Sequence, residues 1–318
     1  MNLFIDTNVL LSFYHLTDDD IEELKKLVAL VKHGQITLWT TTQVADEFAR
    51  NRDSKIKDAL KDFNAPSWRS RAPAFLKDYP EYLAATQFLK EASKRHSALM
   101  IKANADIKAE NLAADSIIRD LRGKATTIEV TPPLFGKGIE RMRAGNPPGK
   151  SGITIGDEIN WECLLLSVPN GQDLHIVSTD KDYAAPLDED ALHPFLASEW
   201  ASKKASTARY YSKLSSFFGE HFKQIKLASE VDRRMAIQRL GASGSFYSTH
   251  IAIAQLNGFT DFTLSEIEDL IEIAMVNGQV GGIMTDDDVG GFYVELVEDN
   301  KDKIDPEKLK MLNRLLFP

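Results

Sequence analysis

The first apolar segment of the chain runs directly into a carboxylate. Residues 3–5 are Leu, Phe and Ile, Asp6 follows at once, and Thr7 and Asn8 come before the apolar residues resume. A buried strand that ends in an unpaired charge is unfavourable, because the charge loses its hydration. In open α/β sheets, ligands bind at the carboxyl ends of strands, which favours a site at Asp6. Alternatively, Asp6 caps a helix beginning near Val9, and this stretch alone does not decide between the two.

Length and composition are those of a globular protein with one large or two ordinary domains. The chain has 318 residues, of which 43% are hydrophobic and 27% are charged,. Cys163 is the only cysteine, which excludes an intrachain disulfide and a cysteine-based zinc site,. The first strand begins near Leu3, which leaves no room for a signal peptide, and no apolar run approaches membrane-spanning length,. We therefore expect a cytoplasmic protein that does not contact a membrane.

The net charge of −9 is unevenly distributed along the chain. Residues 50–150 contain 20 Lys and Arg against 12 Asp and Glu, a net charge of +8, whereas the remainder carries −17. A locally basic segment is what an anionic polymer needs for binding. Solvated helix faces often carry such surpluses without a partner, so charge favours nucleic-acid contact only modestly.

The first part of the chain predicts a βαβ unit. Apolar residues from Leu24 to Val31 recur at helical spacing, and residues 36–40 read as a second strand,. The next helix opens near Thr41 or Thr42 and carries Asp46 and Glu47. We expect Glu47 to lie near the same sheet edge as Asp6, with Asp46 about 100° away on the solvated side.

A long helical insertion and a helical C-terminal region follow from the later pattern. Residues 64–124 read as an inserted helical arm in which several basic residues could line one side, although a solvated helix face explains them equally well. Residues 193–318 read as a mainly helical domain, after a first domain of residues 1–192. Within the second domain, residues 283–290 resemble another strand that ends in acids, and His250 is interpreted as structural,.

The segment from Arg141 to Ser151 contains Gly-Lys-Ser without being a nucleotide-binding P-loop. That motif needs a glycine at position 144, where Ala144 stands, and two prolines precede Gly149,. What remains is a rigid basic loop. Arg141, Arg143 and Lys150 are its candidates for phosphate contact, unless the loop only holds a turn.

Two further acidic blocks repeat the arrangement at Asp6. Asp157 opens a helix, where its charge could simply interact with the helix dipole. A strand at residues 174–178 runs into Asp180 and Asp182. With Glu47, these acids line up at one predicted sheet edge. Hard oxygen ligands with few histidines suit Mg²⁺ or Mn²⁺, and such ions activate water and stabilise phosphate charge.

The order of these blocks resembles the PIN-domain family of metal-dependent nucleases. The similarity lies in residues 4–10, in the helix-borne Glu47, in Gly-Asp before a helix at Asp157, and in residues 177–183. It implies an α/β fold with a PIN-like three-layer parallel sheet, a helical insertion and a mostly α-helical C-terminal domain. The resemblance implies that Asp6, Glu47, Asp157 and Asp180 are catalytic metal ligands, with Asp182 auxiliary and Asn8 or Thr7 supporting Asp6.

The predicted function is that of a metal-dependent endonuclease that hydrolyses RNA more readily than DNA. Nucleic acid is the expected partner, and a homodimer or a protein partner is a further expectation. A haloacid-dehalogenase-like phosphatase also opens on strand-Asp, but it needs a second carboxylate where Asn8 stands. The non-enzymatic alternative is a PIN-like scaffold that binds nucleic acid or protein without cleaving. The residues themselves do not decide between cleavage and binding.

Overall fold

The computed structural model describes residues 1–15, 19–63, 73–149, 154–259, 262–301 and 304–317. The chain divides into two compact units, residues 1–224 and residues 225–318. The boundary lies later than the predicted division after residue 192. The reason is that strand β7 (Ala208–Tyr211), which was assigned to the second domain, pairs with β4 (Leu174–Val177) and completes the first unit's sheet.

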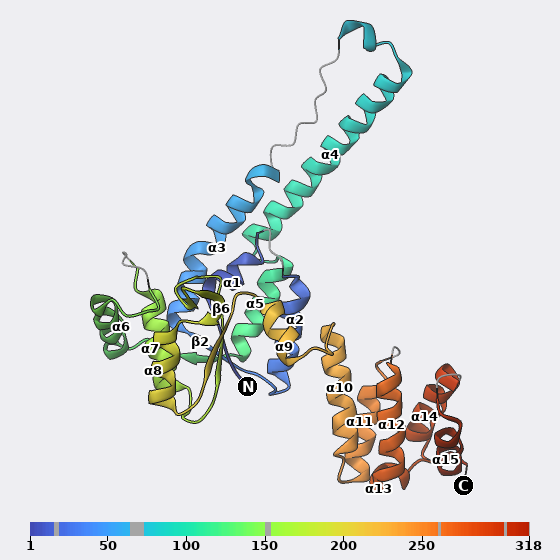
Figure 1. The fold of residues 1–318 in the computed structure, drawn as a ribbon. Helices are drawn as coiled ribbons and strands as arrows, with labels where there is room; N and C mark the ends of the chain where they lie inside the picture. Colours follow the sequence, from blue (N-terminus) through green and yellow to red (C-terminus); the bar gives the residue numbers. More distant parts are fainter. Residues whose placement is uncertain (16–18, 64–72, 150–153, 260–261, 302–303, 318) are drawn as a thin grey trace. The chain divides into compact units, whose positions relative to one another are not determined.

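A five-stranded parallel sheet with the order β3-β2-β1-β4-β7 forms the centre of the first unit (Figure 1). The other three strands are β1 (Asn2–Ile5), β2 (Thr37–Thr41) and β3 (Thr126–Ile128). Strand β1 lies between β2 and β4, and all four of its residues are buried. The sheet therefore confirms the predicted α/β class and places the end of β1 at the middle of one edge.

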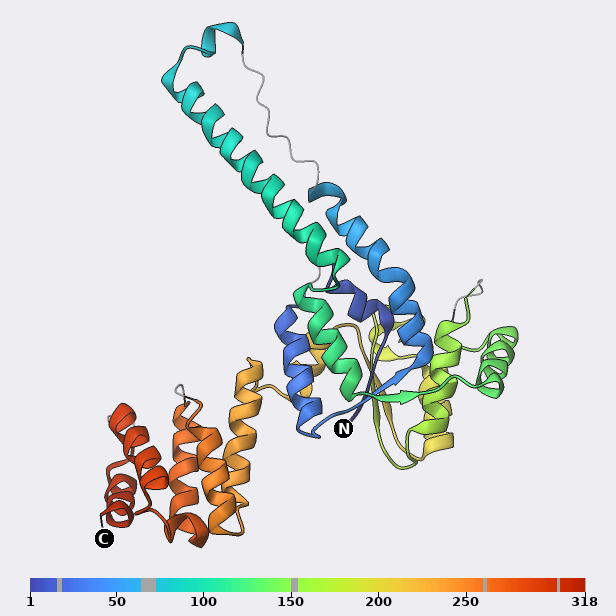
Figure 2. The same ribbon diagram turned by 180° about the vertical axis from the view of Figure 1, so that it is seen from behind.

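Helices cover both faces of this sheet. In both views, α2 and α5 lie on one side and α7 and α8 on the other (Figures 1 and 2). Their cores are apolar, with Leu24 and Leu27 in α2 and Trp161 in α7 fully buried. The helices of this unit are α1 (Thr7–Ser12), α2 (Ile21–Lys32), α3 (Thr42–Phe63), α4 (Pro80–Lys108), α5 (Ala113–Lys124), α6 (Pro132–Ala144), α7 (Gly156–Ser167), α8 (Pro194–Lys204) and α9 (Leu214–His221).

Three shorter elements complete the described part of the unit. A 3-10 turn, η1 (Ala74–Leu76), precedes α4. Strands β5 (Ala184–Ala185) and β6 (Asp188–Leu192) form an antiparallel pair directly after the Asp180 block.

Of the predicted arm, residues 64–124, the first nine lie outside the described residues, and α4 forms its projecting helix. The part of α4 nearer the sheet runs beside the last turns of α3 (Figures 1 and 2). The ring of His96 lies 5.0 Å from that of Phe63, and none of the 29 residues of α4 is buried. Helix α5, which we expected to belong to the arm, instead packs against α2 through buried residues such as Ile118 and Leu121. The apolar face of α5 has to be buried, and packing against α2 on one face of the sheet buries it.

The second unit contains only helices among its described residues: α10 (Ala228–Gly241), α11 (Phe246–Leu256), α12 (Leu264–Val276), α13 (Gly278–Gly281), α14 (Asp287–Asn300) and α15 (Pro306–Leu316). This confirms the predicted helical C-terminal region. The strand expected near residues 283–290 is wrong, since Asp286 is the N-cap residue of α14. His250 Nδ1 lies 2.8 Å from Asp288 Oδ2 within this unit.

No helix in the described part of the chain combines the length and the apolar character that crossing a bilayer demands.

Candidate metal centre

Asp6 lies at the carboxyl end of the central strand, where the chain turns into α1. It occupies the N-cap position, yet its side chain makes no capping hydrogen bond. Its Oδ2 instead accepts a 2.7 Å hydrogen bond from Ser178 Oγ, at the end of the neighbouring strand β4. The carboxylate is only 1% exposed. Its orientation toward the strand ends thus favours a site over the helix-cap alternative.

Glu47 approaches the same edge from α3. Thr7 Oγ1 donates a 3.3 Å hydrogen bond to Glu47 Oε2, and a backbone hydrogen bond from Thr7 acts to lower the pKa of Asp6 against burial. Asn8 is partly buried in α1, next to Asp6 in the chain. Asp46 is exposed, as predicted from its position on the helix.

A glycine brings the helix that carries Asp157 close to α3. A Cβ atom added at Gly156 would lie 3.0 Å from Gln43 Nε2 and 3.5 Å from Glu47 Oε2. A side chain at this position would crowd the Gln43 amide and touch Glu47 at ordinary contact distance. Gly156 therefore permits the first turn of α7, with Asp157 in it, to pack beside Glu47.

Asp157, Asp180 and Asp182 each offer one carboxylate oxygen, and these oxygens all lie within 4.8 Å of one another. A hydrogen bond from the Asp182 amide to Asp180 Oδ1, 3.1 Å long, fixes the turn after β4. The Asp180 amide in turn donates to Ser178 Oγ over 3.0 Å. Ser178 thus connects Asp6 with Asp180. We refer to Asp6, Glu47, Asp157, Asp180 and Asp182 as the carboxylate cluster.

The electrostatics of the cluster favour the binding of a cation. Burial, followed by the negative charges of Asp6, Asp180 and Glu47, raises the pKa of Asp157 to about 8. Burial also raises the pKa of Asp6 to about 6, against the opposing effect of the Ser178 hydrogen bond. A helix N-terminus alone would stabilise the ionised form of Asp157 and lower its pKa. The dipole interpretation of Asp157 therefore does not describe this site.

An unpartnered phenol provides an independent sign that a ligand belongs here. Tyr183 is fully buried, and its hydroxyl finds no hydrogen-bond partner among the residues that the structure describes. Its pKa is raised well above the usual value by burial and then by the charges of Asp157, Asp6 and Asp180. Oxygen donors, clustered negative charge and an unsatisfied hydroxyl together fit a hard divalent cation with coordinated water.

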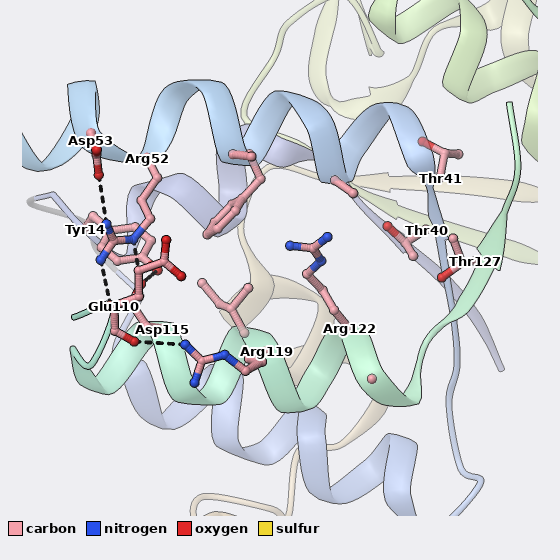
Figure 3. Close-up of a pocket in the computed structure, with 15 residues that line it drawn as sticks. Tyr14, Thr40, Thr41, Arg52, Asp53, Glu110, Asp115, Arg119, Arg122 and Thr127 are labelled. Carbon is pink, nitrogen blue, oxygen red and sulfur yellow. Dashed lines mark hydrogen bonds and ion pairs between the residues drawn. The ribbon is translucent and has the colours of Figure 1, made fainter. Parts of the chain in front are cut away.

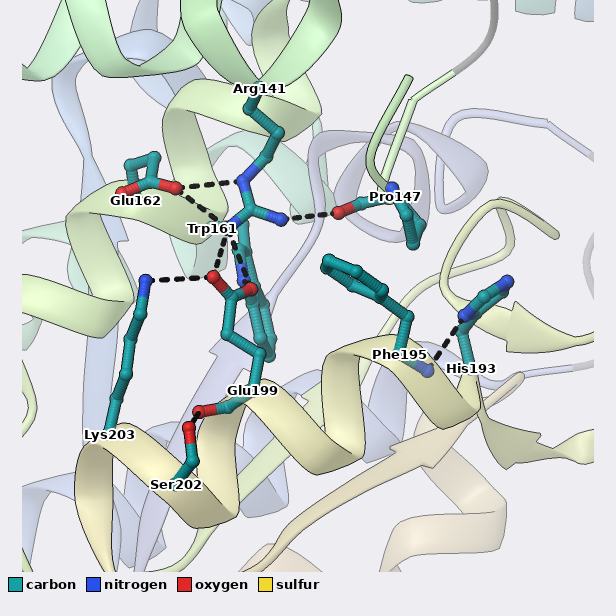
Figure 4. Close-up of polar contacts among 9 residues, drawn as sticks. All are labelled: Arg141, Pro147, Trp161, Glu162, His193, Phe195, Glu199, Ser202 and Lys203. Atoms are coloured by element: carbon teal, nitrogen blue, oxygen red, sulfur yellow. Dashed lines mark hydrogen bonds and ion pairs between the residues drawn. The ribbon is translucent and has the colours of Figure 1, made fainter. Parts of the chain in front are cut away.

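Arg141 has a structural environment in place of the phosphate contact that we expected. Its side chain is 3% exposed, and Nε donates to Glu162 Oε1 over 2.8 Å while Nη2 contacts both oxygens of Glu199 at 2.6 and 2.7 Å (Figure 4). Nη1 donates to the carbonyl oxygen of Pro147 over 2.6 Å. This network joins α6, α7 and α8, and it anchors the loop that precedes Asp157.

The other two basic candidates remain predictions. Arg143 is exposed in the last turn of α6. Lys150 lies outside the described residues. Between them, Gly149 has φ +137°, and a Cβ there would come within 2.1 Å of the carboxylate of Glu158, the residue after Asp157. The loop therefore packs tightly against the start of α7.

A cavity of about 440 Å³ lies between α3 and α5, away from the carboxylate cluster (Figure 3). Its buried acid, Asp115, is already satisfied: Arg52 Nε and Nη2 each donate to it over 2.7 Å, and Tyr14 donates over 2.5 Å. Arg52 correspondingly lowers the pKa of Asp115 against the effect of burial. The contrast with Asp157, whose pKa is raised by burial and by the charges of Asp6, Asp180 and Glu47, makes the carboxylate cluster the better candidate for a metal.

The sequence profile of the PIN-domain family matches residues 3–183, more than half of the chain and the whole span of the carboxylate cluster. The chain belongs to the PIN-domain family. No curated protein and no solved structure matches it. PIN domains are usually nucleases that use divalent metal ions and bind nucleic acid, and the carboxylate cluster is compatible with that general activity. The arm lies inside the matched span, whereas the helical second unit lies beyond it.

Sequence reasoning did not identify the importance of Ser178, Glu158 and Tyr183 in this PIN domain. Ser178 and Tyr183 flank the Asp180 block in the chain, so the signal was their position on either side of it. Glu158 is 2% exposed beside Asp157, and burial raises its pKa. Their roles depend on which side chains of other elements face them.

Proposed function

We propose that this PIN-domain protein is a metal-dependent endonuclease that hydrolyses phosphodiester bonds, with RNA as the preferred substrate over DNA. The observation that carries the proposal is the convergence of carboxylates from separate elements. Oxygens of Asp157, Asp180 and Asp182 lie within 4.8 Å of one another, and burial together with the charges of Asp6, Asp180 and Glu47 raises the pKa of Asp157 to about 8. Asp115, by contrast, is held by Arg52, which lowers its pKa.

Asp6, Glu47, Asp157 and Asp180 would hold Mg²⁺ or Mn²⁺, with Asp182 as an auxiliary ligand. A bound ion of this kind lowers the pKa of a coordinated water and offsets phosphate charge. The protein itself orients the ligands: Ser178 fixes Asp6, and the turn hydrogen bond to Asp180 fixes the spacing of the last two acids. Burial of Asp6 restricts the access of bulk water.

Binding of the nucleic acid is assigned to the basic part of the chain, residues 50–150, which carries a net charge of +8. Arg143 and Lys150 are the proposed phosphate contacts near the site, and Asn8 is the proposed polar contact from α1. Affinity for the polymer should fall with rising salt, because each neutralised phosphate releases counterions. A homodimer or a protein partner and a cytoplasmic location are further parts of this proposal.

The test is cleavage of labelled single-stranded RNA and of DNA with the same sequence, in Mg²⁺, in Mn²⁺ and in chelator. Glu47→Gln and Asp6→Asn should abolish cleavage. Asp46→Asn is the matched control, because it removes the exposed acid adjacent to Glu47 in the same helix. We expect metal-dependent cleavage by the parent and by Asp46→Asn only.

Two results would contradict this proposal. Equal cleavage by the parent and by Glu47→Gln would mean that the reaction occurs elsewhere. Nucleic-acid binding without metal-dependent cleavage would favour the alternative, a PIN-like scaffold. Faster cleavage of DNA than of RNA would overturn the substrate preference alone.

A further inference from the structure

The hydroxyl of Tyr183 is the feature of the site that the carboxylates do not explain. The backbone around it is fully engaged: its amide lies 3.4 Å from the Asp180 carbonyl oxygen, and its carbonyl accepts a 2.8 Å hydrogen bond from the His193 amide. The ring is buried with the core of the first unit. Phenylalanine would supply the same apolar contacts, so packing accounts for the ring and not for its oxygen.

Leaving a buried hydroxyl without a hydrogen bond is unfavourable, and tyrosine hydroxyls usually find a partner when they are buried. The other fully buried tyrosine, Tyr293 in the second unit, follows that rule by donating to the carbonyl oxygen of Leu270 over 3.0 Å. Tyr210 likewise donates to the carbonyl oxygen of Ser178 over 2.8 Å. Tyr183 has no such partner in the described part of the chain.

Carboxyl groups of the metal centre act on this hydroxyl. The groups that act on it electrostatically are Asp157, Asp6, Asp180 and Glu158, all of them carboxyls. A neutral phenol has one proton to donate. Its protonated oxygen is a weak metal ligand, so it leaves the coordination positions of an incoming cation to the carboxylates. It is thus suited to a hydrogen bond with whatever accompanies a cation into the cluster.

We propose that Tyr183 is a positioning residue of the metal centre, whose hydroxyl donates a hydrogen bond to a water molecule held with a divalent cation in the carboxylate cluster. This inference rests on the proposed metal site and extends it beyond the acidic ligands. Tyr183 fixes the position of that water, and its hydrogen bond is completed only when the cation and the water are present.

Loss of the Tyr183 hydroxyl should weaken metal binding without lowering the stability of the metal-free protein. Without divalent metal, Tyr183→Phe should unfold at the same temperature as the parent or a higher one, because no existing hydrogen bond is lost. The matched control Tyr293→Phe removes a formed hydrogen bond and should unfold at a lower temperature. With Mn²⁺, the ranking changes: Tyr183→Phe should bind the ion about three- to tenfold more weakly, and Tyr293→Phe should bind it as the parent does.

The experiment is thermal unfolding of the three full-length proteins in EDTA, with titration of Mn²⁺ by calorimetry. Equal Mn²⁺ affinity of the parent and Tyr183→Phe would overturn the inference. A loss of stability in EDTA as large as that of Tyr293→Phe would also overturn it, because the hydroxyl would then have a partner without metal. A parent that binds no Mn²⁺ overturns it together with the metal site.

Cleavage is measured separately on the same samples, so that the two proposals can fail independently. If the parent binds Mn²⁺ and Tyr183→Phe binds it more weakly while no RNA or DNA is cut, the positioning role holds and the nuclease proposal fails. If the parent cuts RNA and Tyr183→Phe binds Mn²⁺ normally, the nuclease holds and the positioning role fails.

Discussion

Replacing Asp6 by asparagine should stabilise the metal-free protein while it abolishes the proposed cleavage. Asp6 is 1% exposed, and its ionised form is opposed by burial and by the charges of Glu47 and Asp180. Asparagine keeps an oxygen that can accept the 2.7 Å hydrogen bond from Ser178. It removes the negative charge, so the remaining acids repel each other less.

The magnitude follows from the pKa. A tenfold change in an ionisation constant corresponds to about 1.4 kcal/mol. Raising the pKa of Asp6 from 3.8 to about 6 therefore gives an upper value of about 3 kcal/mol, by conversion with the same constant,. The hydrogen bond from Ser178 is weaker to a neutral amide than to a carboxylate, so we expect a net gain of about 1 to 3 kcal/mol.

The gain should depend on pH with a definite sign. Near pH 4, Asp6 is protonated in the folded state and only about half ionised in the unfolded state, so the variant has little advantage there,. A carboxyl with a raised pKa in the folded state reduces stability as the pH rises from its unfolded value to its folded value, here from about 4 to about 6,. Asp157 extends this loss in the parent to about pH 8.

Urea unfolding of the parent, Asp6→Asn and the exposed control Asp46→Asn in EDTA, at pH 4 and pH 8, measures the effect. We expect Asp6→Asn to exceed both others at pH 8 and to match them at pH 4. Saturating Mn²⁺ should reverse the ranking, because ligand binding to the folded state stabilises the parent more. The reasoning is refuted if Asp6→Asn is less stable than the parent at pH 8 without metal.

Three further substitutions test the supporting contacts. Ser178→Ala removes the donor to Asp6, so the acidic limb of the pH–rate profile should move to higher pH; an unchanged profile would contradict the role given to Ser178. Arg141→Ala should cost about 3 to 5 kcal/mol in urea unfolding, since it leaves two carboxylates without their buried partner, and a loss below about 1 kcal/mol would contradict the network. Arg143→Ala should change the free energy of unfolding by no more than about 0.5 kcal/mol. It should reduce the slope of log nucleic-acid affinity against log salt concentration by about one, and an unchanged slope would exclude a phosphate contact.

Charge alone led to a wrong prediction for Arg141, in the segment before Asp157. Arg141 and Arg143 are two positions apart and equally basic in the sequence. On α6 they point in different directions, so one is 3% exposed among carboxylates and the other faces solvent,. Only the packing of α7 and α8 against α6 determined which arginine was available.

The sequence by itself determined the α/β class, the PIN-like order of acidic blocks, and the candidate ligands Asp6, Glu47, Asp157 and Asp180. These follow from local signals, namely apolar strands that end in acids and residue spacing along one helix face, which depend only on near neighbours in the chain. The tertiary structure decided that β7 belongs to the first unit, that Ser178 links Asp6 with Asp180, and that the Tyr183 hydroxyl lacks a partner. Those facts depend on parallel strands brought side by side from distant parts of the chain, and local patterns carry no information about which side chains then face each other.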